Sequence, residues 1–337
     1  MRHEISSAQK RKTMHKRIFN WLLATVMLTT VSFAEAQQAA KIPRIGYLTL
    51  ASAAANLPRR EAFLEGLRNL GYIEGQNIVI EYRYADSNAE RLAELAADFV
   101  RLKVDLIVAG GTQVNLVAKK ATGTIPIVMA NADDPVGSGL IESLARPGGN
   151  VTGLSSMSAE LNSKRLELFR EAFPKIRTLA VLWYKASGPA FKETQTAAQS
   201  LGFKTRPLEL HGPADLQGAF ELLTRERPDG FFPVTSAFMS ANRKPVVEFA
   251  AKYKLPAMYS NREYVEDGGL MSYAANIQEM HRRAASYVDK ILKGSKPAEL
   301  PVEQPTKFEL IVNLKTAKKM EITIPPQVLM DADRVIK

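Results

Sequence analysis

The chain contains one pattern of strands and helices twice. The segments PRIGYLTLAS (residues 43–52) and RTLAVLWYKAS (residues 177–187) both read as an apolar strand followed by a turn. An amphipathic helix comes next in each copy, ending LRNLGY in the first and AQSLGF in the second, and short strands and helices then continue to alternate. Such alternation favours parallel sheets covered by helices on both faces. We therefore predict an α/β protein with two similar doubly wound, Rossmann-like lobes.

The segments that link the two copies predict a chain that passes between the lobes more than once. Residues 266–276 (EDGGLMSYAAN) read as a return strand, and a long amphipathic helix and a further strand at residues 307–314 follow it. We assign residues 37–152 and 268–300 to the first lobe, and residues 153–267 and 301–337 to the second. Several crossings form a hinge, and a hinge between two α/β lobes produces a cleft that can close on a ligand.

The N-terminal segment has the three parts of a secretory signal peptide. Residues 1–17 carry six Lys or Arg against one Glu, residues 18–33 are mostly apolar, and Ala34-Glu35-Ala36 has the form of a cleavage site. The alternative is a membrane anchor, but the apolar run is shorter than the roughly 20 residues that a span needs. We predict cleavage between Ala36 and Gln37, with Met14 as an alternative start, and a mature chain in the periplasm.

The composition excludes several classes of function. The sequence has no cysteine, so an exported chain of this kind has neither disulfides nor a thiol for lipid attachment. Six basic and two acidic residues leave with the signal peptide, which lowers the formal charge from +10 to +6. No cluster of Lys and Arg interleaved with aromatic residues remains, so we expect no nucleic-acid partner.

The motifs of common enzymes are also missing. The chain contains no phosphate-binding loop of the G-x-x-x-x-G-K-[ST] type, no complete dinucleotide-binding glycine motif, no H-E-x-x-H and no G-x-S-x-G. His211 and His281 are the two histidines beyond the signal peptide, and they stand far apart in the sequence. We predict no metal, no cofactor and no enzymatic activity. A hydrolase that relies on Asp or Glu alone remains an alternative, because it leaves no motif.

Ligands of parallel sheets bind beyond the carboxyl ends of the strands, so the loops that follow the strands predict the lining of the cleft. The candidate ligand-binding residues, taken from these loops and from the crossovers, are Ser52, Gly111, Thr112, Gln113, Asp133, Asp134, Ser155, Trp183, Tyr184, Thr235, Ser236, Arg262 and Tyr273.

These residue types suit a small zwitterion. The backbone N–H groups of the loop VDLIVAGGTQVN (residues 104–115) and the hydroxyls of Thr112 and Ser52 suit a carboxylate, and Asp133 or Asp134 suits an ammonium group. Trp183, Tyr184, Phe238 and Tyr273 could form the wall around an apolar or aromatic group. Two alternatives stay open: Asp134, which precedes Pro135, is also a good N-cap for a helix reaching residue 145, and Trp183 equally suits core packing.

The sequence from about residue 41 to residue 336 resembles the substrate-binding proteins of ABC transporters. The segments that carry the resemblance are KIPRIG, LRNLGYIEGQNIVIEYRYAD, DLIVAGGT, IPIVMANADDPVGSGL, LARPGGNVTGLSS, KRLELF, LPAMY, GGLMSYAAN and LPVEQPTKFELIVNLKTAK. The resemblance implies the type I periplasmic-binding fold with three crossovers, and a receptor that delivers a small solute to the permease subunits of an importer. Some members of the family bind aromatic amino acids, so an amino acid or a related carboxylate is the expected ligand.

We also expect a monomer, because the sequence shows no heptad pattern or other oligomer seam. Two other functions use the same residues. A sensory protein would present the liganded form to a membrane receptor in place of a permease. A periplasmic enzyme would convert the solute to a product.

Overall fold

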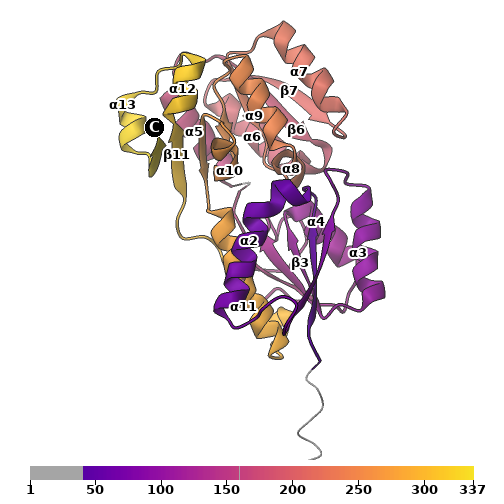
Figure 1. The fold of residues 1–337 in the computed structure, drawn as a ribbon. Helices are drawn as coiled ribbons and strands as arrows, with labels where there is room; N and C mark the ends of the chain where they lie inside the picture. Colours follow the sequence, from indigo (N-terminus) through magenta and orange to yellow (C-terminus); the bar gives the residue numbers. More distant parts are fainter. Residues whose placement is uncertain (1–40, 159) are drawn as a thin grey trace, which may run out of the picture. The chain divides into compact units, whose positions relative to one another are not determined.

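The structure is a computed structural model that describes residues 41–158 and 160–337. The predicted signal peptide and its cleavage site lie outside the described residues. Five strands, in the order β2-β1-β3-β4-β5, form the sheet of the first lobe, and every adjacent pair is parallel. They are β1 (Arg44–Thr49), β2 (Val79–Tyr84), β3 (Leu106–Gly110), β4 (Ile127–Asn131) and β5 (Val151–Gly153). The helices of this lobe are α2 (Ala53–Asn69), α3 (Arg91–Leu102), α4 (Thr112–Ala121) and α11 (Ile277–Leu292) (Figure 1).

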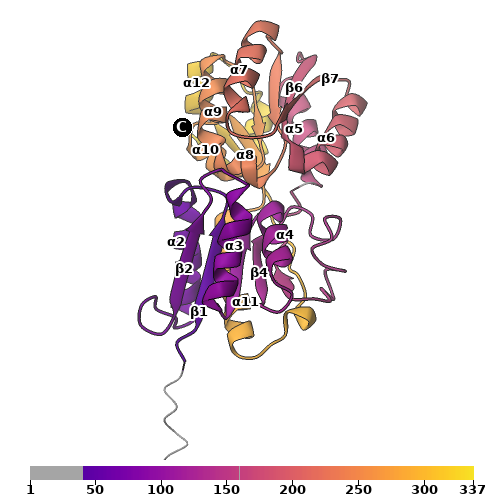
Figure 2. The ribbon, with the colours of Figure 1, turned by 90° about the vertical axis from the view of Figure 1, so that its right-hand side faces the viewer.

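Helices cover both faces of this sheet, as the alternation of strands and helices predicts. Phe63 of α2 and Ala284 of α11 pack with Val108 on one face of the sheet. Phe99 of α3 packs with Ile107 on the other face. Figure 2 shows α3 and α4 together on this face of the sheet. Neighbouring residues of a strand point to opposite faces, so the near-continuous apolar run of β3 contributes to both cores.

The second lobe contains a mixed sheet. Three strands in the order β7-β6-β8 and four in the order β12-β11-β10-β9 are joined by a parallel bridge between Phe231 and Ala257. The strands are β6 (Thr178–Tyr184), β7 (Lys204–Leu210), β8 (Gly230–Pro233), β9 (Met258–Tyr259), β10 (Met271–Ala274), β11 (Glu309–Asn313) and β12 (Arg334–Ile336). The helices are α5 (Leu161–Ala172), α6 (Gly188–Ser200), α7 (Asp215–Glu226), α8 (Ala237–Ala241), α9 (Arg243–Lys252), α10 (Arg262–Glu266), α12 (Leu314–Met320) and α13 (Pro326–Met330), with a short 3-10 turn, η2 (Lys185–Ser187), before α6.

The second lobe corrects two details of the prediction. β10 and β11 run antiparallel, so this sheet is not purely parallel like the first. β10 also pairs with β9, which places residues 271–274 in the second lobe, whereas the sequence pattern assigned residues 268–300 to the first. The pattern shows that a strand follows β9, but a strand of four residues carries no information about which sheet it joins.

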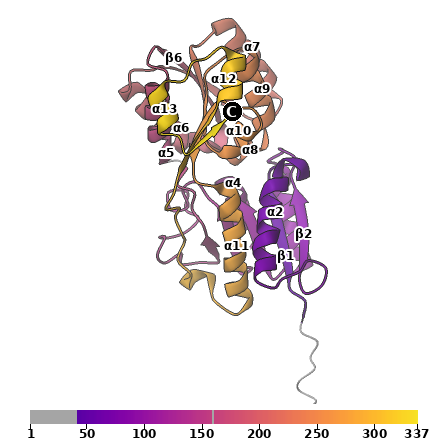
Figure 3. The same cartoon turned by 60° about the vertical axis from the view of Figure 1, so that its left-hand side comes forward.

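The chain crosses between the lobes three times. The first crossing leads from β5 to α5, the second from β10 to α11, and the third from η3 (Pro297–Glu299), which lies beside β5, to β11. Figure 3 shows the chain leaving the second lobe, forming α11 and returning to β11. The first and third crossings are hydrogen-bonded to each other, since Ser155 N donates to Glu303 O at 2.9 Å. The predicted hinge of several crossings is present.

The helix expected after Pro135 does not form. Residues 133–145 make turns instead, and Asp134 Oδ1 accepts a hydrogen bond from Gly137 N at 2.8 Å. Asp134 therefore caps a turn in the way that it would cap a helix. The long C-terminal helix does form, and Asn276 caps it by accepting a hydrogen bond from Glu279 N at 3.0 Å.

Along the parts of the chain that the structure describes, no helix is both long and apolar enough to span a bilayer.

Candidate ligand-binding cleft

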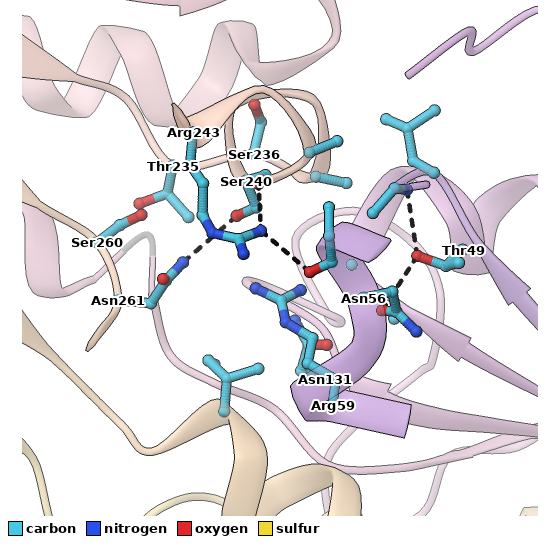
Figure 4. A pocket seen from close by; sticks show the side chains of 18 of the residues that line it. Thr49, Asn56, Arg59, Asn131, Thr235, Ser236, Ser240, Arg243, Ser260 and Asn261 are labelled. Carbon is cyan, nitrogen blue, oxygen red and sulfur yellow. Dashed lines mark hydrogen bonds between the residues drawn. The ribbon is translucent and has the colours of Figure 1, made fainter. Parts of the chain in front are cut away.

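Two cavities lie side by side where the carboxyl ends of strands from both lobes meet. The small cavity has a volume of about 30 Å³, and the large cavity has a volume of about 380 Å³. The polar residues of the small cavity are Thr49, Asn56, Arg59, Asn131, Asp133, Ser158, Thr235, Ser236, Ser240, Arg243, Ser260 and Asn261 (Figure 4). The large cavity is lined mainly by Thr112, Gln113, Leu116, Asp133, Asp134, Ser138, Tyr184, Ser187, Pro189, Ala190, Glu193, Thr235 and Ser236. Asp133, Thr235 and Ser236 line both cavities, and we call the two cavities together the cleft.

The opening of helix α4 supplies uncapped backbone donors to the cleft. Gly111 lies at the N-cap position with a φ of 90°, in the left-handed region that favours glycine, and no side chain of the described residues caps the helix. The N–H groups of the first helical turn are therefore left for water or a ligand. Gly111 also faces the second lobe closely, because a Cβ atom built on it would lie 2.8 Å from Ala237 Cβ.

Asp133 is a carboxylate in the cleft without an ion-pair partner in residues 41–158 and 160–337. Its Oδ2 accepts a hydrogen bond from Thr112 Oγ1 at 3.3 Å, and its Oδ1 accepts one from Ser156 Oγ at 3.3 Å. Burial raises the pKa of the Asp133 carboxyl above its ordinary value of 3.8, although these hydrogen bonds oppose the shift. A cationic group in the cleft would relieve this unpaired negative charge.

The same geometry corrects the role expected for Thr112. Its hydroxyl accepts a hydrogen bond from Asp133 N at 2.9 Å and donates to the Asp133 carboxylate. The single hydroxyl proton is therefore directed to an acid of the protein, so it does not serve a ligand carboxylate.

Two asparagines present unused polar atoms to the small cavity. Asn131 and Asn261 are only 7% and 4% exposed, and the Oδ1 atom of each has no hydrogen-bond partner among the described residues. Buried polar atoms are rarely left unpaired, because each unmade hydrogen bond costs about 1–3 kcal/mol. Unpaired acceptors at this position are consistent with a site that is completed by water or a ligand.

Two arginines bring positive charge to the small cavity from opposite lobes. Arg59 of α2 forms an ion pair with Glu263 of α10 in the other lobe. Burial opposes ionisation of Glu263, but the charge and hydrogen bonds of Arg59 outweigh burial and lower the pKa of that carboxyl. Arg243 of α9 pairs with Asp267 at 2.7 Å. It also donates to Ala55 O of α2 at 3.1 Å, and Figure 4 shows Arg243 reaching toward α2.

Tyr184 brings an aromatic ring to the wall of the large cavity, and Phe238 supports that ring from behind. Tyr184, at the end of β6, stacks on Phe238 of α8 with ring centroids 4.3 Å apart. Leu116, Pro189 and Ala190 add apolar surface, and Glu193 adds a carboxylate. The large cavity therefore suits an apolar or aromatic group, while the residues shared with the small cavity suit charged atoms.

Of the candidate residues, eight line the cleft: Gly111, Thr112, Gln113, Asp133, Asp134, Tyr184, Thr235 and Ser236. The other five do not, namely Ser52, Ser155, Trp183, Arg262 and Tyr273. Ser52 caps α2, Ser155 is buried in the first crossing, Trp183 stacks on Phe191, Arg262 pairs with Glu266, and Tyr273 packs near Phe308.

The candidate set omitted several residues that line the small cavity. Asn56 and Arg59 lie in the first two turns of α2, three residues apart and on the same side of the helix. The position of this helix directly after β1 was a signal that its first turns face the cleft. Ser240 and Arg243 lie on α8 and α9, and no pattern in the sequence marks them.

The described ranges contain no group of three or more His, Asp or Glu side chains placed to hold a metal ion. His281 is buried near the cleft, where its Nδ1 lies 2.9 Å from Ile277 O. Burial and the charge of Arg59 lower the pKa of His281 to about 4, so the imidazole is neutral at physiological pH.

Comparison with known proteins agrees with this architecture. The chain is 26% identical over 267 residues to a tyrosine-binding protein of Clostridioides difficile, covering 78% of this chain and 76% of the relative. A conserved domain protein of Vibrio cholerae has a similar structure, with a TM-score of 0.81, 28% identity, and coverage of 88% of this chain and 100% of the other. An ABC domain from Streptococcus pneumonia, solved in complex with L-Trp, has a TM-score of 0.78 and 25% identity, with coverage of 87% and 99%.

These similarities confirm the type I periplasmic-binding fold that the resemblance implied. The sequence model described as ABC transporter substrate binding protein matches residues 44–336, which is nearly the whole described chain. The chain therefore belongs to the family of ABC transporter substrate-binding proteins.

Proposed function

We propose that this protein is the extracytoplasmic receptor of an ABC importer and that it captures an α-amino acid with an aromatic side chain. The observation that carries the proposal is Asp133, a carboxylate without a cationic partner among the described residues, at the junction of the two cavities. An α-ammonium group at this position would supply the missing charge. The predicted signal peptide supports an exported chain, and the family supports delivery of the ligand to permease subunits.

The head group of the amino acid would lie at the junction of the cavities. The ammonium group pairs with Asp133, and the carboxylate meets the uncapped N–H groups of α4 and the hydroxyls of Thr235 and Ser236. The Ser236 hydroxyl oxygen already accepts a hydrogen bond from Met239 N at 3.1 Å, so its proton is available to the ligand. Thr235 and Ser236 of the second lobe thus take the place of Thr112 as hydroxyl donors to the ligand carboxylate.

The side chain of the ligand would occupy the large cavity. Its volume of about 380 Å³ falls in the range of small-molecule sites, and Tyr184, Leu116 and Pro189 provide apolar contact. The relatives from Clostridioides difficile and Streptococcus pneumonia, described as tyrosine-binding and as a complex with L-Trp, support an aromatic ligand. The small cavity of about 30 Å³ has room for only about two water molecules, so the ligand enters when the lobes separate.

Isothermal titration with L-tyrosine and L-tryptophan, with L-alanine and benzoate for comparison, tests the proposal. We expect an aromatic amino acid to bind at least ten-fold more tightly than L-alanine, and benzoate, which lacks the ammonium group, to bind weakly. Asp133→Asn should weaken binding about ten- to hundred-fold, because it removes a hydrogen-bonded charge pair. The matched control is Asp98→Asn on α3, where Asp98 pairs with Arg83 away from the cleft.

The pH dependence of binding offers a further check. Protonation of Asp133 removes the partner of the ammonium group, so affinity should fall as the pH drops through the raised pKa of this carboxyl. Equal affinity for benzoate and the amino acids, or no binding of any amino acid by the wild-type protein, would rule out the proposed ligand class.

A further inference from the structure

Arg165 is a buried arginine whose hydrogen-bond acceptors, within the part of the chain that the structure describes, are all neutral groups. It lies in the second turn of α5 and is 1% exposed. Its guanidinium donates to three carbonyl oxygens, those of Tyr273 at 2.7 Å, Ser158 at 2.7 Å and Ser260 at 3.4 Å. It also donates to Asn162 Oδ1 at 2.9 Å and to the hydroxyls of Ser158 and Thr235, and because Nη1 has two protons for three acceptors, one of those protons is shared.

These acceptors connect the hinge to the cleft. Ser158 belongs to the first crossing, and Tyr273 is in β10 just before the second. Thr235 and Ser260 follow β8 and β9, and both line the small cavity together with Ser158. One guanidinium therefore holds three residues of the cleft wall from behind, and it fixes them relative to two of the three crossings.

The positive charge of Arg165 is not neutralised by contact with an acid. No ion pair with Arg165 occurs in residues 41–158 and 160–337, and the acid whose charge acts on it most strongly is Asp133. Burial lowers the pKa of Arg165 to about 10, which still leaves the guanidinium charged at neutral pH. The wall of the second lobe thus carries a positive charge just behind the cleft hydroxyls.

The hydrogen bonds around Thr235 leave one direction for its proton. Thr235 Oγ1 accepts from Arg165 Nη1 at 3.3 Å and from Ser158 Oγ at 3.4 Å. Ser158 Oγ in turn accepts from Arg165 Nη2 at 2.9 Å. A hydroxyl has two acceptor lone pairs and one donor proton, so both acceptor positions of Thr235 are filled. The Thr235 proton is therefore left to donate into the cleft. The hydrogen bonds run from the positively charged guanidinium of Arg165 through Ser158 to Thr235, and each bond in such a series polarises the next.

We propose that Arg165 is a positioning residue that makes the Thr235 hydroxyl an obligatory donor to the carboxylate of the bound amino acid. The proposal deepens and rests on the proposed function, since it names the second-lobe donor to a carboxylate that also meets the N–H groups of α4, while the ammonium group pairs with Asp133. Closure on the ligand then brings the Thr235 hydroxyl of the second lobe to a head group that the first lobe already holds. A hydrogen bond to a charged acceptor is stronger than one to a neutral acceptor, so the arrangement selects an acid over its amide.

The test compares L-tyrosine with L-tyrosinamide, and L-tryptophan with L-tryptophanamide, by isothermal titration. Each amide keeps the ammonium group and the side chain but lacks the charged carboxylate. For the wild-type protein we expect the acid to bind at least ten-fold more tightly than its amide. Thr235→Val and Arg165→Met should each reduce this acid-to-amide ratio about ten-fold, and Thr235→Ser should preserve it.

The acid-to-amide affinity ratio distinguishes a positioning role of Arg165 from a role in folding alone. A role in folding alone lowers the affinity for acid and amide equally, so the ratio would not move. Arg170→Met is the matched control, because Arg170 also lies on α5 and donates to the carbonyl oxygens of Ile176 and Leu201, away from the cleft. It should lower the melting temperature and leave the ratio unchanged.

Arg165→Lys covers the case in which Arg165→Met does not fold. Lysine keeps the charge but has too few N–H donors to bond both hydroxyls and the carbonyl oxygens. We therefore expect an acid-to-amide ratio between those of the wild-type protein and Arg165→Met. An unchanged ratio in Thr235→Val, or in whichever Arg165 variants fold, overturns the assignment while the proposed function stands. If neither amino acid binds to the wild-type protein, the proposed function fails and this assignment fails with it.

Discussion

Arg59 of α2 and Glu263 of α10 form an ion pair that joins the first lobe to the second. Arg59 Nε donates to Glu263 Oε1 at 2.7 Å, and Nη2 donates to the other carboxylate oxygen. The side chains are only 12% and 4% exposed. Each charge is therefore shielded from water and depends on its partner in the opposite lobe.

Glu263→Gln should shift the unliganded protein toward separated lobes. The variant leaves the Arg59 charge buried without its counter-ion, a loss that typically costs about 3–5 kcal/mol unless water reaches the charge. Small-angle scattering should then show a larger radius of gyration than for the wild-type protein. The control is Glu321→Gln, which breaks an exposed pair with Lys254 inside one lobe. Identical radii for wild type and Glu263→Gln would contradict this account.

Gly111→Ala should weaken ligand binding through contact between the lobes. The added Cβ would approach Ala237 Cβ to 2.8 Å and would also sit at a φ of 90°, which L residues rarely adopt. We expect lower stability, by about 1–2 kcal/mol from the backbone strain, together with lower affinity for the ligand. Adding Ala237→Gly should restore part of the affinity and little of the stability. Thermal melts and titration of the single and double variants separate the two effects, and no recovery of affinity would count against the steric explanation.

Substitutions at two adjacent aromatic residues should have different consequences. Tyr184 lines the large cavity, whereas Trp183 stacks on Phe191 at 4.4 Å and lines neither cavity. Tyr184→Leu should therefore weaken binding of an aromatic amino acid several-fold, because contact between two aromatic rings contributes about 0.5–1.5 kcal/mol in addition to the burial of their apolar surface. Trp183→Leu should lower the melting temperature without changing the affinity. Titration and melting curves of both variants check this, and the reverse pattern would show that the ligand lies elsewhere.

His281 should make the protein less stable in mild acid. Its folded-state pKa is about 4, below the ordinary value of 6.5, so between these values the unfolded chain takes up a proton that the folded protein does not. The stabilisation is therefore fully present above pH 6.5 and is lost as the pH falls toward 4, by up to about 3 kcal/mol. Urea unfolding at pH 7 and pH 5 should show a smaller loss in His281→Gln than in the wild-type protein. An equal loss in both would assign the acid sensitivity to other groups.

The elements of the fold could be predicted because they depend on local patterns. The apolar runs at residues 106–110 and 127–131 form buried strands, and the loops after them reach the cleft, as parallel topology requires. Seven of the eight candidate residues that line the cleft stand within three positions after the end of a strand, and the eighth, Tyr184, is the last residue of β6. The sheet to which β10 belongs could not be predicted in the same way, because strand pairing depends on distant parts of the chain.

The remaining site residues depend on contacts that a sequence pattern does not contain. Trp183 and Tyr184 are neighbours in β6, and alternation places them on opposite faces of the sheet without saying which face meets the cleft. Arg262 follows a strand as expected, but Glu266 stands four residues away on the same helix and pairs with its side chain. Arg165 lies on helix α5, whereas the candidate residues were taken from loops that follow strands and from the crossovers. Its hydrogen-bond acceptors come from residues up to 108 positions away in the sequence.

Helix α11 also affects the order in which the protein can fold. It packs on the first lobe, yet it is encoded between β10 and β11 of the second. A ribosome that has made all five strands of the first sheet has still to make more than 120 residues before this helix is complete. Until then part of one apolar face of the sheet, around Val128 and Ala130, has no cover. The N-terminal lobe therefore cannot complete its core until the chain up to residue 292 is available.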